Sequence, residues 1–252
     1  MYLVVDSGNT CTKVAVFNEK KAIVDLNRWE NPSPQQYLEL IQVYEIQAVI
    51  VCSVVGVDPA ILDLFHEYIP FVLVLDHHTP VPIKNAYLSP QTLGYDRLAV
   101  AVAAHSLRPG KPLLVIDAGT AITYEFVSPD GTYQGGNIAP GAQMRLHALH
   151  HFTQKLPLLP FLDYRVERAE QYGLGKDTDS ALLNGVAQGM VFEIEGYIRD
   201  LKEKYPELLI FLTGGDAFFF ERRLKNSIFV VPNLLLFGLH QILVYNTCLS
   251  TR

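Results

Sequence analysis

The chain has 252 residues, 49% of them hydrophobic, and a formal net charge of −6. This length is sufficient for two modest domains with hydrophobic cores, and the composition excludes a disordered chain. The acidic balance, without any run of Lys or Arg, argues against a nucleic-acid-binding surface.

Residues 3–16 predict a strand, a tight turn and a second strand. The segment 3–5 is apolar and mostly β-branched, as in a buried strand, and 6–10 has turn chemistry with Gly8 free to adopt a positive φ. From residue 12 onward the side chains alternate between two faces, with Lys13 on the face opposite Thr12. Backbone N–H groups, hydroxyls and a lysine around one turn suit a phosphate.

The remainder of the first half predicts an α/β domain with a mixed sheet, because strands and helices alternate after the first hairpin. Three prolines make 79–92 a loop, and an alanine-rich helix follows with Asp96 and Arg97 in its first turn. The other expected elements are a strand at 22–26, a helix at 35–44, a strand at 47–53, a helix opening at Asp58-Pro59 and a strand at 71–75.

The second half begins with a repeat of the first. In 113–124 an apolar strand again leads into an Asp-x-Gly turn, and Asp117 takes the place of Asp6. An internal repeat of this kind implies two similar domains, here 1–112 and 113–252. Two such turns facing each other would clamp a polyphosphate from both sides.

Beyond the repeat, glycines at 135–141 predict a segment that approaches a ligand closely, and Thr178 is an expected helix N-cap by residue type. His147, His150 and His151 have the spacing of metal ligands on one helix, although no carboxylate joins them. The expected elements are a hairpin turn at 128–131, helices at 142–153 and 179–205, a strand at 208–212, and helices at 217–224 and 233–245.

Five stretches together resemble type III pantothenate kinase, in the actin–hexokinase–Hsp70 phosphotransferase superfamily. They are 6–13, 94–97, 117–121, 135–141 and 213–217, and they occur in the family's order over nearly the whole chain. The resemblance implies two related RNase H-like α/β domains, each a mixed sheet with helices, facing across a nucleotide cleft. The implied reaction is ATP-dependent phosphorylation of pantothenate to 4′-phosphopantothenate, the first step of coenzyme A biosynthesis.

The resemblance also assigns a substrate site. Asp96 would be the catalytic base, and Arg97 would pair with the pantothenate carboxylate through its planar fork. A threonine at the position of Thr178 would contact pantothenate, commonly across a dimer interface. The implied substrate-binding residues are Tyr87, Gly94, Tyr95, Asp96, Arg97 and Thr178.

The implied cofactors are ATP, Mg²⁺ and a monovalent cation. Asp6 would hold Mg²⁺, through water, and Asp117 would hold the K⁺ or ammonium that the family requires. The implied ATP-binding residues are Asp6, Ser7, Gly8, Asn9, Thr10, Cys11, Thr12, Lys13, Thr120, Gly214 and Gly215.

Three other functions stay open at this point. A sugar or acetate kinase of the same superfamily is disfavoured by Gly94-Tyr95-Asp96-Arg97. A polyphosphate or nucleotide phosphatase would need an activated water and no bound alcohol. A non-catalytic regulatory or DNA-binding relative is disfavoured by the acidic charge and by the intact Asp6, Asp96 and Asp117.

The expected setting is a cytoplasmic homodimer that acts on a small molecule, with no nucleic acid and no membrane. Three scattered cysteines without a CxxC pair fit a reducing compartment. We expect no signal peptide, and the longest apolar run, 48–57, is too short to span a membrane. The dimer rests on the resemblance alone.

Overall fold

The computed structural model describes residues 1–8, 11–53, 56–162 and 173–250. The chain forms two compact units. The first comprises Met1–Pro109, Gly131–Tyr133 and the segment from Leu234 onward, and the second comprises Gly110–Asp130 and Gln134–Asn233. The sequence placed everything after residue 112 in the second domain, whereas the C-terminal helix groups with the first unit.

The first unit is built on a five-stranded mixed sheet with the order β3-β2-β1-β4-β5. Strand β1 runs antiparallel to β2 and parallel to β4, as expected of a hairpin followed by strand–helix–strand connections. The strands are β1 (Tyr2–Ser7), β2 (Thr12–Phe17), β3 (Ile23–Trp29), β4 (Ala48–Ser53) and β5 (Phe71–Val74).

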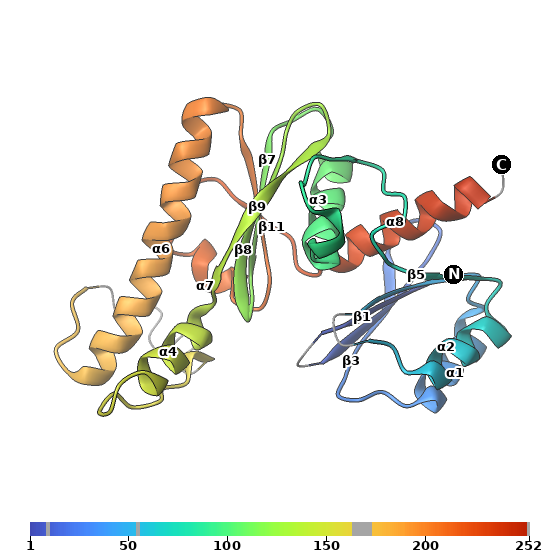
Figure 1. The fold of residues 1–252 in the computed structure, drawn as a ribbon, viewed down its shortest axis with the longest axis horizontal. Coiled ribbons are helices and arrows are strands. Elements are labelled where there is room, and N and C mark those ends of the chain that lie inside the picture. Colours follow the sequence, from blue (N-terminus) through green and yellow to red (C-terminus); the bar gives the residue numbers. More distant parts are fainter. Residues whose placement is uncertain (9–10, 54–55, 163–172, 251–252) are drawn as a thin grey trace. The chain divides into compact units, whose positions relative to one another are not determined.

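Helices cover both faces of this sheet (Figure 1). Alternate residues of β1 enter two separate cores: Leu3 packs with the core beneath α1 and α2, and Val4 packs with the core beneath α3 and α8. Asp58 begins α2, because its carboxylate accepts a 2.9 Å hydrogen bond from the Ala60 N–H. The helices are α1 (Pro34–Tyr44), α2 (Pro59–Tyr68), α3 (Tyr95–Leu107) and α8 (Leu234–Ser250).

The expected loop at 79–92 contains only short regular elements. Strand β6 (Lys84–Asn85) pairs in parallel with Thr132 and Tyr133, and a single 3-10 turn spans Pro90–Thr92. Three prolines and the lack of an apolar period explain why nothing longer forms.

The second unit repeats the hairpin of the first. Strands β7 and β8 are antiparallel, β10 joins β7 in parallel, and the order along the sheet is β11-β10-β7-β8-β9. Its main core lies between this sheet and the helices α4, α6 and α7 (Figure 1). The elements are β7 (Leu113–Ala118), β8 (Ala121–Val127), β9 (Thr132–Pro140), α4 (Ala142–His151), α6 (Thr178–Lys204), β10 (Leu209–Thr213), α7 (Ala217–Glu221) and β11 (Phe229–Val230).

The expectation that Thr178 caps α6 is wrong. Asp177 is the N-cap, with its carboxylate accepting a 2.8 Å hydrogen bond from the Ser180 N–H, and Thr178 is the first helical residue. Both residue types are good caps, and the extended backbone of Asp177 decides between them. Among the described helices, none is both long and apolar enough to cross a membrane.

His240 on α8 makes the first unit sensitive to acid. Its side chain is buried, its ring stacks on Phe17 with centroids 4.4 Å apart, and neither ring nitrogen has a hydrogen-bond partner among the described residues. Burial, and to a lesser extent the charge of Lys21, lowers the pKa of His240 to about 4.

Lowering the pH from 7 to 5 is therefore expected to cost the fold about 2 kcal/mol through His240 alone. Between pH 7 and pH 5 the unfolded chain, with a histidine pKa of about 6.5, binds a proton at His240, whereas the folded chain does not. Urea unfolding at both pH values measures the loss. The His240→Phe variant keeps the stacked ring without a titrating group, so an equal loss in that variant would assign the acid sensitivity to other groups.

Candidate functional site

The first Asp-x-Gly turn presents its charged side chains on one face of the sheet. Asp6 and Lys13 are directly opposite each other in the β1–β2 register, on the face shared with Val4 and Ala15. Burial raises the pKa of Asp6 to about 6; the Asp96 charge adds to the rise and Lys13 opposes it. A half-buried carboxylate and an ammonium together suit a phosphate with its accompanying cation.

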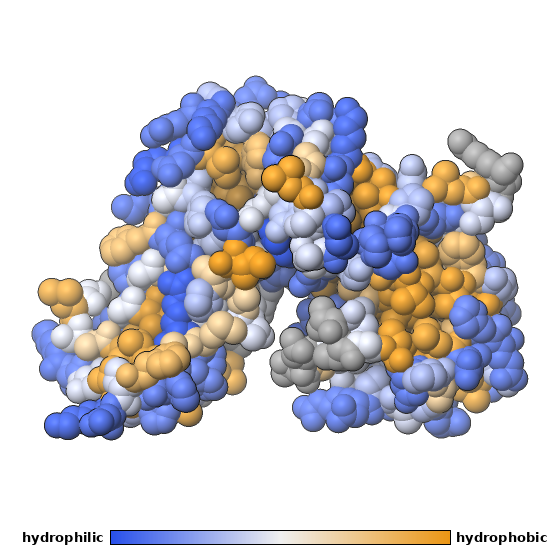
Figure 2. Space-filling view, viewed as in Figure 1, coloured by the Kyte–Doolittle hydropathy of each residue, from blue (hydrophilic) through white to orange (hydrophobic). Residues whose placement is uncertain are grey.

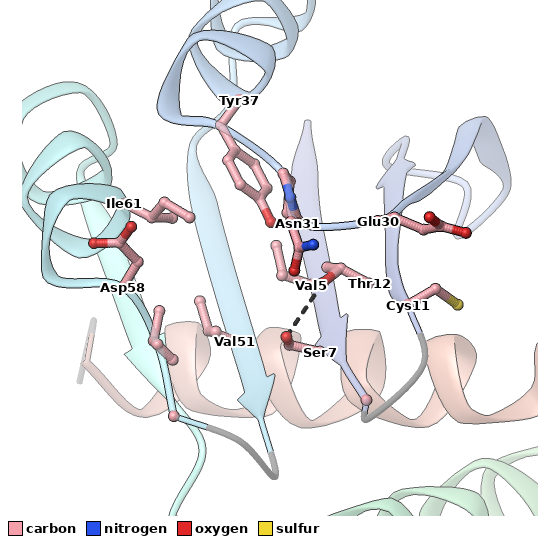
Figure 3. Close-up of a pocket in the computed structure, with 14 residues that line it drawn as sticks. Val5, Ser7, Cys11, Thr12, Glu30, Asn31, Tyr37, Val51, Asp58 and Ile61 are labelled. Atoms are coloured by element: carbon pink, nitrogen blue, oxygen red, sulfur yellow. Dashed lines mark hydrogen bonds between the residues drawn. The ribbon is translucent and has the colours of Figure 1, made fainter. Parts of the chain in front are cut away.

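The hydroxyl groups of the same turn lie on the other face. Ser7 Oγ and Thr12 Oγ1 are 3.2 Å apart and line a cavity together with Cys11 (Figure 3). The Gly8 N–H donates to the Cys11 carbonyl at 3.2 Å, which closes the turn. The predicted ATP residues Asn9 and Thr10 lie outside the described residues.

The N-terminus of α3 holds the predicted substrate residues. Asp96 Oδ1 accepts a 2.8 Å hydrogen bond from the Arg97 N–H, and a Cβ at Gly94 would meet that same oxygen. A side chain at position 94 would therefore displace the Asp96 carboxylate from this arrangement. Tyr95, one residue before Asp96, packs partly against the core beneath α3 and α8.

Arg97 is unusual in being only 6% exposed. Its guanidinium lies 5.6 Å from the centre of the Tyr87 ring, and Tyr87 stacks in turn on Tyr133. The proline-rich loop thus brings Tyr87 to Arg97. Asp96 belongs with this group, and its charge also raises the pKa of Asp6, so the α3 motif lies near the first turn within the first unit.

The second turn gathers three stretches of the second unit. The Gly141 N–H donates to the Thr120 carbonyl at 3.1 Å, and the Asp216 N–H donates to the Ala118 carbonyl at 2.9 Å. A Cβ at Gly214 would collide with the Ala118 carbonyl and meet Asp117 Oδ1. The sequence identified these stretches, but it did not show that Gly141 and Asp216 join them through backbone hydrogen bonds.

The two hairpins differ in register by one residue. Lys13 is opposite Asp6 in the first hairpin, whereas Thr123 is opposite Asp117 in the second. The second turn is therefore shorter, and its carboxylate faces a hydroxyl at the position of the lysine. A carboxylate oxygen is a type of ligand that cations bind in proteins.

Thr178 lies in the second unit, exposed at the start of α6, where it lines an apolar groove of about 1030 Å³. The groove runs between α4 and α6 and includes Met144 and Phe152, the latter 82% exposed. Figure 2 shows hydrophobic side chains at the surface over α4. An apolar surface of this kind favours an interaction site.

Comparison with known proteins identifies the family. Residues 2–200 match the type III pantothenate kinase family. A type III pantothenate kinase of Bacteroides fragilis is 47% identical over 246 residues, which cover 98% of each chain. The chain belongs to the type III pantothenate kinase family. Another type III pantothenate kinase, from Phocaeicola vulgatus, is 45% identical and covers 98% of this chain and 99% of its own.

Solved structures of lower identity show the fold. A Campylobacter jejuni protein described as a Baf family transcriptional activator aligns with a TM-score of 0.58 at 22% identity, over 98% of this chain and 99% of its own. An activator of 2-hydroxyisocaproyl-CoA dehydratase from Clostridium difficile, with bound ADPNP, aligns at 0.55 and 11% identity, over 99% and 96%. The predicted actin–hexokinase class of fold and the kinase class of enzyme are confirmed.

Among the described residues, the three histidines of α4 are not joined by further ligands into a metal centre. His150 Nδ1 lies 2.7 Å from the Leu156 carbonyl, and His147 and His151 are exposed. Over the part of the chain that the structure describes, no three His, Cys, Asp or Glu side chains are placed to hold a metal ion.

Proposed function

We propose that the chain transfers the γ-phosphoryl group of ATP to the primary 4′-hydroxyl of pantothenate, with Asp96 as the catalytic base. The observation that supports this proposal is that Asp6, Asp96 and Arg97 all belong to the first unit and that the Asp96 charge acts on Asp6. A base, a cation-binding carboxylate and an anion-binding guanidinium are the groups that phosphorylation of a hydroxy acid requires.

Each group has a distinct task in this reaction. Arg97, already ordered against Tyr87, pairs with the pantothenate carboxylate, and this contact fixes where the hydroxyl lies. Asp96 orients that hydroxyl and accepts its proton as the phosphoryl group arrives. Lys13 cradles the phosphates, and Asp6 holds Mg²⁺, which supplies charge neutralisation at the transferring group.

We assign the second turn to the nucleotide and a monovalent cation. Gly214 and Gly215 admit the nucleotide close to the backbone, and Thr120 contacts its phosphates. Asp117, opposite Thr123, holds K⁺ or ammonium. The support for these roles is the open space beside Gly215 and the position of Asp117 near the end of β7.

The test measures ADP formed from ATP with Mg²⁺ and K⁺, with and without pantothenate. We expect ADP release to depend on pantothenate and to match phosphopantothenate formed mole for mole. Phosphate release without pantothenate would support the phosphatase alternative. Replacing K⁺ by Na⁺ and comparing Asp117→Asn with the unmodified chain tests the cation assignment separately.

We further propose a homodimer in which the groove beside Thr178 meets a second copy of the chain. The exposed Phe152 and the apolar lining of the groove support this. Sedimentation of the intact chain, compared with a Phe152→Asp variant, measures the association. The three free cysteines support a cytoplasmic setting.

The catalytic efficiency for MgATP is expected to fall tenfold per pH unit below about pH 6. Asp6 has a pKa of about 6, and its protonated form cannot hold Mg²⁺. Because Lys13 lowers the pKa of Asp6, the Lys13→Gln variant should lose efficiency at a higher pH. A pH profile of kcat/KM for both proteins measures this shift, and an unchanged acid limb in Lys13→Gln would assign that limb to another group.

A further inference from the structure

A second cavity lies in the first unit, on the face of the sheet opposite Asp6. It has a volume of about 650 Å³ and opens between the sheet and the helices α1 and α2 (Figure 3). Val5, Ser7 and Thr12 line it from the sheet, and alternation along β1 and β2 turns these side chains away from Asp6 and Lys13. The cavity therefore lies on the other face of the sheet from Asp6 and Lys13, and its lining shares Ser7, Gly8, Cys11 and Thr12 with the turn expected to bind ATP.

Tyr37 of α1 brings a hydrogen-bonding group to this cavity from within the core. Its side chain is 1% exposed, and its ring is held edge-on by Trp29 and Phe65 at centroid distances of 5.3 and 5.2 Å. The hydroxyl points toward Asn31 and Thr12 in Figure 3.

The Tyr37 hydroxyl has no hydrogen-bond partner among the described residues, and burial raises the pKa of this tyrosine. The hydroxyl oxygen is in contact with the cavity and is not sealed inside the core. A tyrosine hydroxyl can donate and accept a hydrogen bond, and the packed ring holds this one in a fixed position. The tyrosine thus offers a polar contact to a molecule that enters the cavity.

The charges around the cavity restrict which partner fits. Glu30 and Asp58 are the charged residues among its described lining, which includes no Lys, Arg or His. An anion such as a phosphate would find no counter-charge there. Val5, Val51 and Ile61 supply an apolar wall, and the Asn31 amide supplies both a donor and an acceptor (Figure 3).

We propose that this cavity binds a small uncharged molecule with an amide or hydroxyl head on a short aliphatic body. The head bonds to the Tyr37 hydroxyl and the Asn31 amide, and the body packs on Val51 and Ile61. The volume is within the range of small-molecule sites.

Occupancy of the cavity is coupled to the phosphate turn. The Ser7–Thr12 pair forms one wall of the cavity and also the base of that turn. A bound ligand therefore changes the affinity for ATP, and ATP changes the affinity for the ligand by the same factor. This consequence rests on the proposed function, whereas binding itself does not.

Titration of the full chain with pentanamide, pentylammonium and pentanoate, without nucleotide, tests the site. The three probes share one skeleton and differ in charge. We expect pentanamide to bind most tightly, with a millimolar Kd, in ligand-detected NMR. Tyr37→Phe should weaken it by about 2- to 10-fold, the range for one hydrogen bond. Tyr68→Phe, which removes an exposed hydroxyl outside the cavity lining, should leave binding unchanged.

The outcomes separate this proposal from the kinase assignment, since binding is measured without ATP or pantothenate. Preference for pentanamide with a loss confined to Tyr37→Phe supports the site. Absence of binding, tighter binding of either charged probe, or equal affinity in Tyr37→Phe overturns it. Thermal melts of both variants verify that each is folded before titration.

Discussion

Asp96→Asn is expected to lower kcat for pantothenate phosphorylation by about 10²- to 10⁴-fold. The amide has the size of the carboxylate, so the N-terminal turn of α3 should stay intact around Gly94. It can still accept the Arg97 N–H hydrogen bond through its oxygen. What it cannot do is take the proton of the attacking hydroxyl. The KM for pantothenate should change little, because Arg97 carries the carboxylate contact.

A second readout distinguishes a missing base from a disturbed site. The Asp96 charge raises the pKa of Asp6, so its removal should move the acid limb of kcat/KM for MgATP to lower pH. Lys13→Gln moves the same limb in the opposite direction and is the matched control. A kcat within threefold of the unmodified chain would place the base elsewhere. A large loss of kcat with an unmoved limb would contradict the proximity of Asp96 and Asp6.

The site in the first unit could be predicted from local pattern because alternation along a strand is strict. If 3–5 is a strand and the side chains of 12–16 alternate between two faces, Lys13 must lie on one face of the sheet with Ala15, and Thr12 must lie on the other face. The repeat at Asp117 likewise predicted a second hairpin. These inferences depend only on residues that are close in the sequence. The resemblance to the family then indicated which ligands these residues are expected to bind.

Features set by tertiary packing could not be predicted in this way. The register of the second hairpin depends on one residue in the turn, and the repeat of residue types does not report it. Asp177 and Thr178 are both acceptable caps by type. Helix α8 is apolar on all sides, so its sequence predicts that the helix is buried but not which elements it packs against. Its grouping with the first unit was therefore not predicted.

Gly238→Ala is expected to destabilise the first unit by about 3 kcal/mol, the upper range for overpacking. A Cβ at Gly238, on α8, would overlap the backbone carbonyl of Ala99 on α3. A backbone carbonyl inside a helix cannot rotate away as a side chain can, so the two helices must separate. Separation would also open contacts in the core that Val102 and Leu239 share. Denaturant unfolding measures the loss.

The control is Gly189→Ala on α6, where a Cβ would meet nothing within 4 Å. Alanine there should stabilise its helix by about 0.5–1 kcal/mol, since glycine is the poorer helix former. The sign therefore reverses between two helical glycines, and a similar effect at both would refute the packing argument. Because α3 also carries Asp96 at its N-terminus, the helix displacement in Gly238→Ala should lower kcat as well. Small residues in the α3–α8 contact thus hold the proposed base in place, more than 100 residues along the chain from α8.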